Sequence, residues 1–98
     1  MFQPPPTMIL LVEDNPGDAR LIREMLQEVL RPGFDVAEAG RLDEACARLA
    51  RGGIEAILLD LTLPDAHGVE TVRKVVACAP AIPVVVLTGL DDQAVALQ

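Results

Sequence analysis

The 98-residue chain is long enough for one small domain, and its hydrophobic fraction of 51% argues against a disordered polypeptide. A formal net charge of −7 disfavours direct binding to nucleic acid, because phosphate recognition requires Lys and Arg. No apolar run approaches the roughly 20 residues of a membrane helix, and no secretory leader follows Met1, so we expect a cytoplasmic protein without membrane contact.

The start of the chain predicts a tail, a strand and a helix. Residues 1–7 are a proline-rich lead-in that we expect to be flexible. The all-apolar run 8–12 predicts a strand buried on both faces, and two acids follow it at once, Glu13 and Asp14. The Asn-Pro pair next to them is typical of a helix start, and an apolar stripe that includes Met25 continues at helical spacing to Val29.

The middle of the chain predicts a second strand and a second helix. Residues 34–39 alternate apolar and polar, which is typical of a half-exposed strand at a sheet edge. Apolar residues at helical spacing between 42 and 49 indicate a short helix, which a glycine pair ends. Cys46 in this helix and Cys78 in the next have no partner at metal-ligand spacing, so we expect both to be small buried apolar residues.

Residues 54–68 carry the most informative pattern. The apolar run 56–59 predicts a third buried strand, and it stops on Asp60. Because an ionised carboxylate is costly to bury, Asp60 should lie where the strand emerges from the core. A proline and a glycine mark the following segment as a loop. His67 in this loop has no clustered ligands, so we expect it to be solvated rather than bound to a metal.

The rest of the chain continues the alternation of strands and helices. Valines at helical spacing over 69–76 predict a third helix, residues 84–87 predict a fourth apolar strand ending on Thr88, and a last helix is expected from Asp91. Strict alternation is typical of a parallel sheet with helices on both faces. In such a sheet the carboxyl ends of the strands lie on one side, where ligands bind.

The predicted topology therefore gathers Glu13, Asp14, Asp60 and Thr88 at one edge of the sheet. Crowded carboxylates repel one another unless a cation lies among them, and hard oxygen ligands favour Mg²⁺. With phosphoryl oxygens drawn to the cation, Asp60 can attack phosphorus to form an aspartyl phosphate, and Thr88 can donate its hydroxyl to the new group. The simpler alternative, unrelated polar strand ends, has to explain all of these residues as coincidence.

These residues also carry a resemblance: the chain resembles the CheY-like receiver domain of two-component response regulators. The resemblance covers residues 8–98 and rests on residues 10–15, 59–64 with Gly68, and 85–89. It implies an α/β, flavodoxin-like, doubly wound parallel sheet of order 2-1-3-4-5. The fifth strand and fifth helix of that family are missing here, which leaves the order 2-1-3-4.

The resemblance also implies residue roles and partners. Asp60 would be the phosphoacceptor and Thr88 the switch hydroxyl, while Asp14, Asp60 and the backbone carbonyl of Thr62 would hold Mg²⁺, with Glu13 acting mostly through water. The phosphoryl donor would be a sensor histidine kinase or a histidine phosphotransfer protein, and an output domain or effector protein would be controlled. Such a domain is a signalling phosphoacceptor, not an enzyme, and assists only its own phosphorylation and dephosphorylation.

The sequence departs from the family where a lysine should end the fifth strand. Lys74, the only lysine, lies in the third helix and cannot replace it. We therefore expect a truncated receiver or the first piece of a longer regulator, with residues 84–87 as an exposed edge that favours self-association.

Three alternatives stay open. The first is a phosphorylation-incompetent interaction module, either a pseudo-receiver or a truncated fragment. The second is an aspartyl-phosphate phosphatase of the haloacid dehalogenase type, which needs an Asp where Thr62 stands. The third is a nucleotide-binding α/β enzyme, which needs a glycine-rich turn after the first strand, where this chain has acids.

Overall fold

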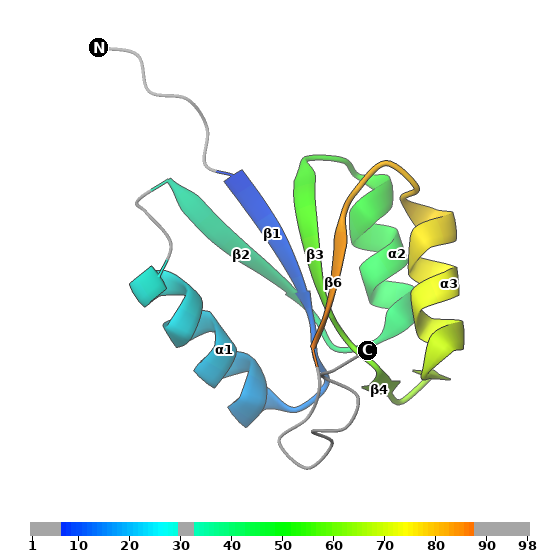
Figure 1. Cartoon of the computed structure of the whole chain (residues 1–98), viewed down its shortest axis with the longest axis horizontal. Coiled ribbons are helices and arrows are strands. Elements are labelled where there is room, and N and C mark those ends of the chain that lie inside the picture. The colour runs from blue at the N-terminus through cyan, green and yellow to red at the C-terminus, as the bar shows by residue number, and fades with distance from the viewer. Residues whose placement is uncertain (1–6, 30–32, 88–98) are drawn as a thin grey trace.

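The computed structural model describes residues 7–29 and 33–87, and strands alternate with helices along them (Figure 1). The elements are, in chain order, β1 (Thr7–Val12), α1 (Pro16–Val29), β2 (Phe34–Ala39), α2 (Leu42–Ala50), β3 (Ile54–Asp60), β4 (Thr62–Leu63), β5 (Ala66–His67), α3 (Val69–Cys78) and β6 (Val84–Leu87). The bounds of β2 match the sequence prediction, and β1 begins one residue earlier than predicted, at Thr7. The helix predicted from Asp91 lies outside the described residues.

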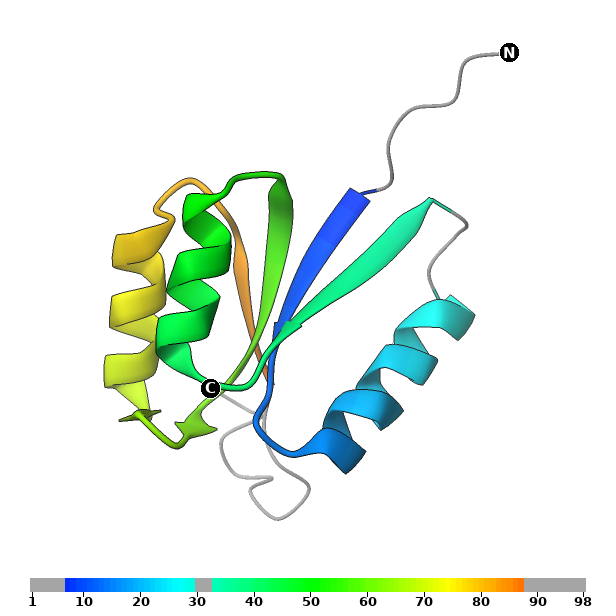
Figure 2. The ribbon, with the colours of Figure 1, turned by 180° about the vertical axis from the view of Figure 1, so that it is seen from behind.

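The main sheet has four parallel strands in the order β2-β1-β3-β6. This is the predicted order 2-1-3-4 of a flavodoxin-like fold, with β6 as the fourth strand of the prediction. Helix α1 covers one face of the sheet, and α2 and α3 lie side by side on the other (Figures 1 and 2). None of the helices in the described part of the chain is long and apolar enough to cross a membrane.

The core lies mainly between the sheet and the α2–α3 pair. Its members come from the two central strands and from the inner faces of these helices, and include Leu10, Val12, Ala45, Leu49, Ile57, Leu59 and Val75. Strand β1 is buried from Ile9 to Val12, as its uninterrupted apolar run predicted. The central strands are therefore held in place at the ends where their acids emerge.

The face that carries α1 is less well covered. Only Ala19 of α1 is buried, whereas Met25 and Val29, which the helical pattern had placed on the inner stripe, are 56% and 80% exposed. Strand β6 is also partly exposed, with Val85 at 51% and Val86 at 40%. Within the described residues β6 is an edge strand, which agrees with the exposed edge expected from the sequence.

The cysteines correct a prediction. Cys46 and Cys78 were expected to be free and buried, but they form a disulfide that links α2 to α3, with their Cα atoms 5.7 Å apart. Cys46 is half-buried and Cys78 is exposed. The sequence prediction was wrong because the residues are 32 positions apart, so that only the packing of the two helices makes them neighbours.

The segment after Asp60, predicted as a loop, contains a small antiparallel hairpin. Thr62 pairs with His67 and Leu63 pairs with Ala66, and the turn between the strands holds Asp65. Leu63 and Ala66 are buried, while His67 is exposed as expected. The hairpin therefore folds the segment back against the core instead of leaving it in solvent.

Candidate functional site

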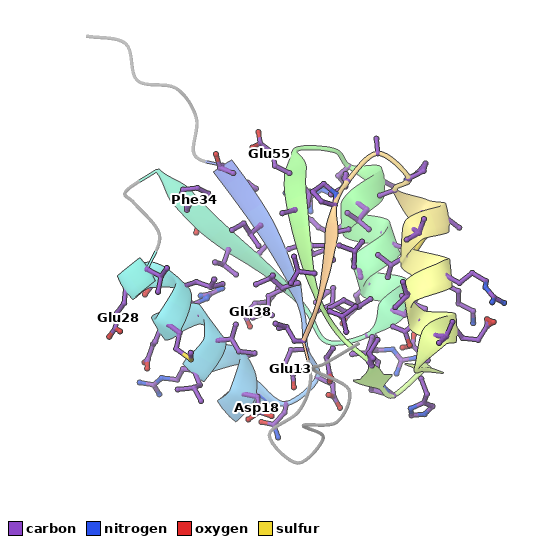
Figure 3. The ribbon with its side chains drawn as sticks, in the orientation of Figure 1. Glu13, Asp18, Glu28, Phe34, Glu38 and Glu55 are labelled. Atoms are coloured by element: carbon purple, nitrogen blue, oxygen red, sulfur yellow. A yellow bond between two sulfur atoms is a disulfide. The ribbon has the colours of Figure 1, made fainter. Side chains whose placement is uncertain are left out.

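The pairing of the two central strands sets the acids side by side. Val12 of β1 pairs with Leu59 of β3, so the next residues along each strand, Glu13 and Asp60, are level with each other. The Glu13 N–H continues the ladder by donating to the Ala39 carbonyl oxygen at 2.9 Å. Figure 3 shows Glu13 at the carboxyl end of β1, close to Asp18 in the first turn of α1.

Three carboxylates meet at this edge. One oxygen each from Glu13, Asp14 and Asp60 lies within 4.8 Å of the other two, a spacing that one metal ion can bridge. Glu13 and Asp60 are half-buried and Asp14 is exposed, so the cluster is open to solvent on one side. Carboxylate oxygens are the ligands that Mg²⁺ prefers, and this ion usually keeps several of its waters.

The cluster is electrostatically strained without a cation. The pKa of Glu13 is raised to about 7, mainly because the carboxyl is partly buried and also because the Asp60 charge and a hydrogen bond with Asp60 favour its protonated form. The Asn15 N–H, 3.4 Å from a Glu13 carboxylate oxygen, opposes this shift. Near neutral pH the Glu13 carboxyl therefore readily holds a proton, which a divalent cation would displace.

The loop that carries Glu13 and Asp14 is fixed by the start of α1. The Asn15 side-chain oxygen accepts the Asp18 N–H at 3.0 Å, and the Asn15 carbonyl accepts the Ala19 N–H at 2.9 Å. This is the helix cap predicted from the Asn-Pro pair. The loop that bears Glu13 and Asp14 is therefore short, and it is held at one end by the buried strand β1 and at the other by the capped helix α1.

The segment that follows Asp60 has an anchor that sequence reasoning missed. Asp65 accepts the backbone N–H groups of Leu42 at 2.8 Å and Asp43 at 3.2 Å, and Arg41 lies 3.7 Å away. These contacts, the Leu42 N–H above all, hold the pKa of Asp65 below its usual value. The N-terminus of α2 is thus capped by Asp65, a residue more than 20 positions further along the chain. Arg41, the residue directly before α2, makes no side-chain cap.

The remaining predicted residues fall around this cluster in different ways. Thr62 opens β4 two positions after Asp60, in the segment that leaves the site. Thr88 lies outside the described residues; β6 ends at Leu87, which pairs with Asp60. Lys74 is exposed on α3. Of the predicted site residues, Glu13, Asp14 and Asp60 are brought together.

A parallel α/β sheet of this order, with acids at the carboxyl ends of its central strands, defines a receiver-type domain. The sequence model of the response regulator receiver domain matches residues 9–98, and the chain belongs to this family of two-component signalling proteins. It is therefore a receiver domain rather than a haloacid dehalogenase-type phosphatase or a nucleotide-binding enzyme.

Individual proteins agree with the family match. The chain is 35% identical over 83 residues to the swarming motility regulation protein RssB of Serratia marcescens, covering 85% of this chain and 36% of that protein. It is 34% identical over 94 residues to the transcriptional regulatory protein ResD of Bacillus subtilis, covering 96% of this chain and 38% of the relative. The chain thus spans less than half the length of these relatives.

Solved structures show the same fold. The MaeR response regulator bound to beryllium trifluoride superimposes with a TM-score of 0.75 at 25% identity, over 92% of this chain and 73% of that chain. The agreement covers 73% of that chain, so the fold described above is shared with this solved response regulator.

Proposed function

We propose that this receiver domain accepts a phosphoryl group on Asp60 with the help of Mg²⁺. The observation that supports the proposal is the meeting of Glu13, Asp14 and Asp60 within 4.8 Å at the carboxyl ends of β1 and β3. Asp14, Asp60 and the backbone carbonyl of Thr62 would hold the ion, and Glu13 would act mostly through water. The ion, when bound, neutralises the acids and attracts phosphoryl oxygens to them.

In the transfer, an Asp60 oxygen bonds to phosphorus while the bond from phosphorus to the donor's imidazole nitrogen breaks, and the electron pair leaves with the imidazole. The attack needs Asp60 ionised. Mg²⁺ among the acids would favour this form, because the cation offsets the charge of the neighbouring carboxylates. Thr88 would move toward the phosphoryl group and donate its hydroxyl to it, and this movement would switch the conformation of the domain.

The partners follow from this chemistry. The donor would be a sensor histidine kinase or a histidine phosphotransfer protein in the cytoplasm, and residues 8–98 would act on an output domain or effector. Of the predicted lead-in 1–7, residues 1–6 lie outside the described residues and Thr7 begins β1. The domain would act as a signalling phosphoacceptor without turning over other substrates. The domain would also associate with a second copy of itself through the exposed Val85 and Val86 of β6. Sedimentation tests this association, which the Val85→Lys variant should weaken.

Acetyl phosphate with Mg²⁺ provides the test of phosphorylation. Intact mass should rise by one phosphoryl group, and hydroxylamine should remove it because an acyl phosphate is labile. Asp60→Asn should abolish the gain and weaken Mg²⁺ binding by at least about tenfold, since even outer-shell changes at metal sites cost that much. Asp43→Asn, the same change at an exposed acid of α2, should alter neither. A phosphate that survives hydroxylamine, or that persists in Asp60→Asn, would contradict the assignment.

A second candidate function is a receiver that binds its partner without being phosphorylated. Within the described residues it is favoured by the position of their one lysine, Lys74, which lies exposed on α3 and not on a strand of the sheet. An uncompensated phosphoryl charge would make the aspartyl phosphate short-lived or absent. Mg²⁺ binding that depends on Asp60, together with no mass gain from acetyl phosphate, would identify this case.

A further inference from the structure

The disulfide between α2 and α3 has no part in the chemistry of the acidic edge. Cys46 lies in the middle of α2 and Cys78 is the last residue of α3. Their Cα atoms are 5.7 Å apart, within the range that a disulfide spans without backbone movement. These are the only two cysteines of the sequence, so no third thiol competes for either of them.

The two sulfur-bearing residues differ in access. Cys78 is exposed at the end of its helix, whereas Cys46 is half-buried between the helices. Thiol–disulfide exchange starts with a thiolate attacking one sulfur and passes through a mixed disulfide, so the accessible residue is the one that meets an external reagent. Cys78 can therefore form a mixed disulfide with a small thiol. The Cys46 thiolate can then displace that thiol and form the internal disulfide again.

Helix α2 is bound at two places to the segment that follows Asp60. At its N-terminus, Asp65 accepts the N–H groups of Leu42 and Asp43. In its middle, the disulfide attaches it to the last residue of α3. The Asp65 contacts and the buried cluster that includes Leu49 and Val75 do not depend on the disulfide. Reduction therefore removes the covalent tie at Cys78, while Val75 and Ala79 on either side of it remain in the core.

We propose that Cys46 and Cys78 form a reversible thiol–disulfide site that locks the last turn of α3 to α2. In the oxidising direction the Cys78 thiolate attacks glutathione disulfide, one glutathione leaves, and the Cys46 thiolate then displaces the second from Cys78 Sγ. Two thiols lose two electrons and two protons, and one glutathione disulfide becomes two molecules of glutathione. The inference goes beyond the proposed function and does not depend on Asp60 being phosphorylated.

Cys78, the accessible half of the disulfide, ends α3 on the side of the sheet opposite to the acidic edge. Helix α3 leads into the amino end of β6, where the Pro83 carbonyl accepts the Ile57 N–H at 3.0 Å, whereas Asp60 lies at the carboxyl end of β3. Figure 1 shows α3 running between these ends, from the β4–β5 hairpin to the connection before β6. The redox state should therefore change the mobility of the helix pair and leave Mg²⁺ binding unchanged.

The experiment equilibrates the full chain in glutathione buffers of increasing disulfide content, then alkylates free thiols and measures intact mass. The protein should pass from two alkyl groups to none as the buffer becomes oxidising, and back again when it is reduced. Hydrogen exchange at the end of α3, from Val75 to Ala79, should be slower in the oxidised form by about tenfold, as expected for closing a local opening. Affinity for Mg²⁺ should stay within about twofold, a free-energy change well under that of losing one ligand.

The double variant Cys46→Ser/Cys78→Ser is the control, and it should fold and show the same exchange rates in both buffers. Several results would overturn the proposal. A mixed disulfide or a linked dimer in place of the internal bridge would show that the pair does not close. Resistance to glutathione would make it a permanent crosslink. Loss of the whole fold on reduction, or in the double variant, would show that the bridge supports the entire domain and does not lock one turn.

Discussion

Glu13 is the residue whose ionisation should be visible in stability. Its pKa is about 7 in the folded protein against 4.5 for the ordinary side chain, so between these pH values the folded state binds more protons than the unfolded state. Stability from this group is therefore fully present below pH 4.5 and is lost as pH rises through about 7. With metal chelated, the melting temperature should therefore fall as the pH is raised from 4.5 to about 7.

Thermal unfolding of wild type and Glu13→Gln across this pH range isolates the effect. The variant should be less sensitive to pH, because glutamine does not titrate, and added Mg²⁺ should reduce the loss in the wild type by favouring ionised carboxylates. Parallel melting curves for the two proteins would refute the assignment of the raised pKa to Glu13.

Asp65 offers a second test at the scale of one residue. Asp65→Ala removes the acceptor for the Leu42 and Asp43 N–H groups, which then lie at a helix start with no side-chain cap. We expect faster hydrogen exchange at these two amides and a lower melting temperature. Glu70→Ala is the comparison, because Glu70 lies in the first turn of α3 and pairs only with exposed Arg73 among the contacts described. Equal effects of the two changes would rule out an anchoring role.

Among the elements, β1 has an unbroken run of buried residues, from Ile9 to Val12. Leu10 is fully buried between the neighbouring strands and the α2–α3 face, so Leu10→Ala should lower the free energy of unfolding by about 2–5 kcal/mol through lost transfer energy and a cavity. Leu21→Ala, the same change at a 48% exposed position on α1, should stay within about 0.5 kcal/mol. Urea denaturation of both variants checks the ranking, which similar midpoints would contradict.

The elements also show what the sequence could and could not predict. Apolar runs and alternation located the strands, and the strand ends located Glu13, Asp14 and Asp60, because these patterns act over a few residues. The order of the strands came from the resemblance to receiver domains. The Asp65 cap and the disulfide join positions more than 20 residues apart, and no local pattern marks such pairs. Periodicity placed Met25 and Val29 on an inner face, but burial depends on what packs there, and both are exposed.

For the whole molecule, the disulfide should contribute substantially to stability. It closes a loop between residues 32 positions apart, and the loop-entropy estimate for that length is about 3–4 kcal/mol. Reduction should lower the free energy of unfolding of the wild type by an amount of this order, and leave Cys46→Ser/Cys78→Ser unaffected. Denaturation with and without reductant measures the difference. Identical curves for the wild type would show that the bridge adds nothing beyond the packing of α2 and α3.

The bridge has a further consequence for the connectivity of the chain. Oxidised, it makes a covalent ring from Cys46 to Cys78 that contains all of β3, including Asp60, and four basic residues at which trypsin cuts, Arg48, Arg51, Arg73 and Lys74. One cut anywhere on this ring opens it without separating any piece, because the two ends stay joined through sulfur. A nick in the exposed Gly52–Gly53 turn would therefore leave the strand that bears Asp60 tethered at the cysteines, and only a reductant would let the halves part.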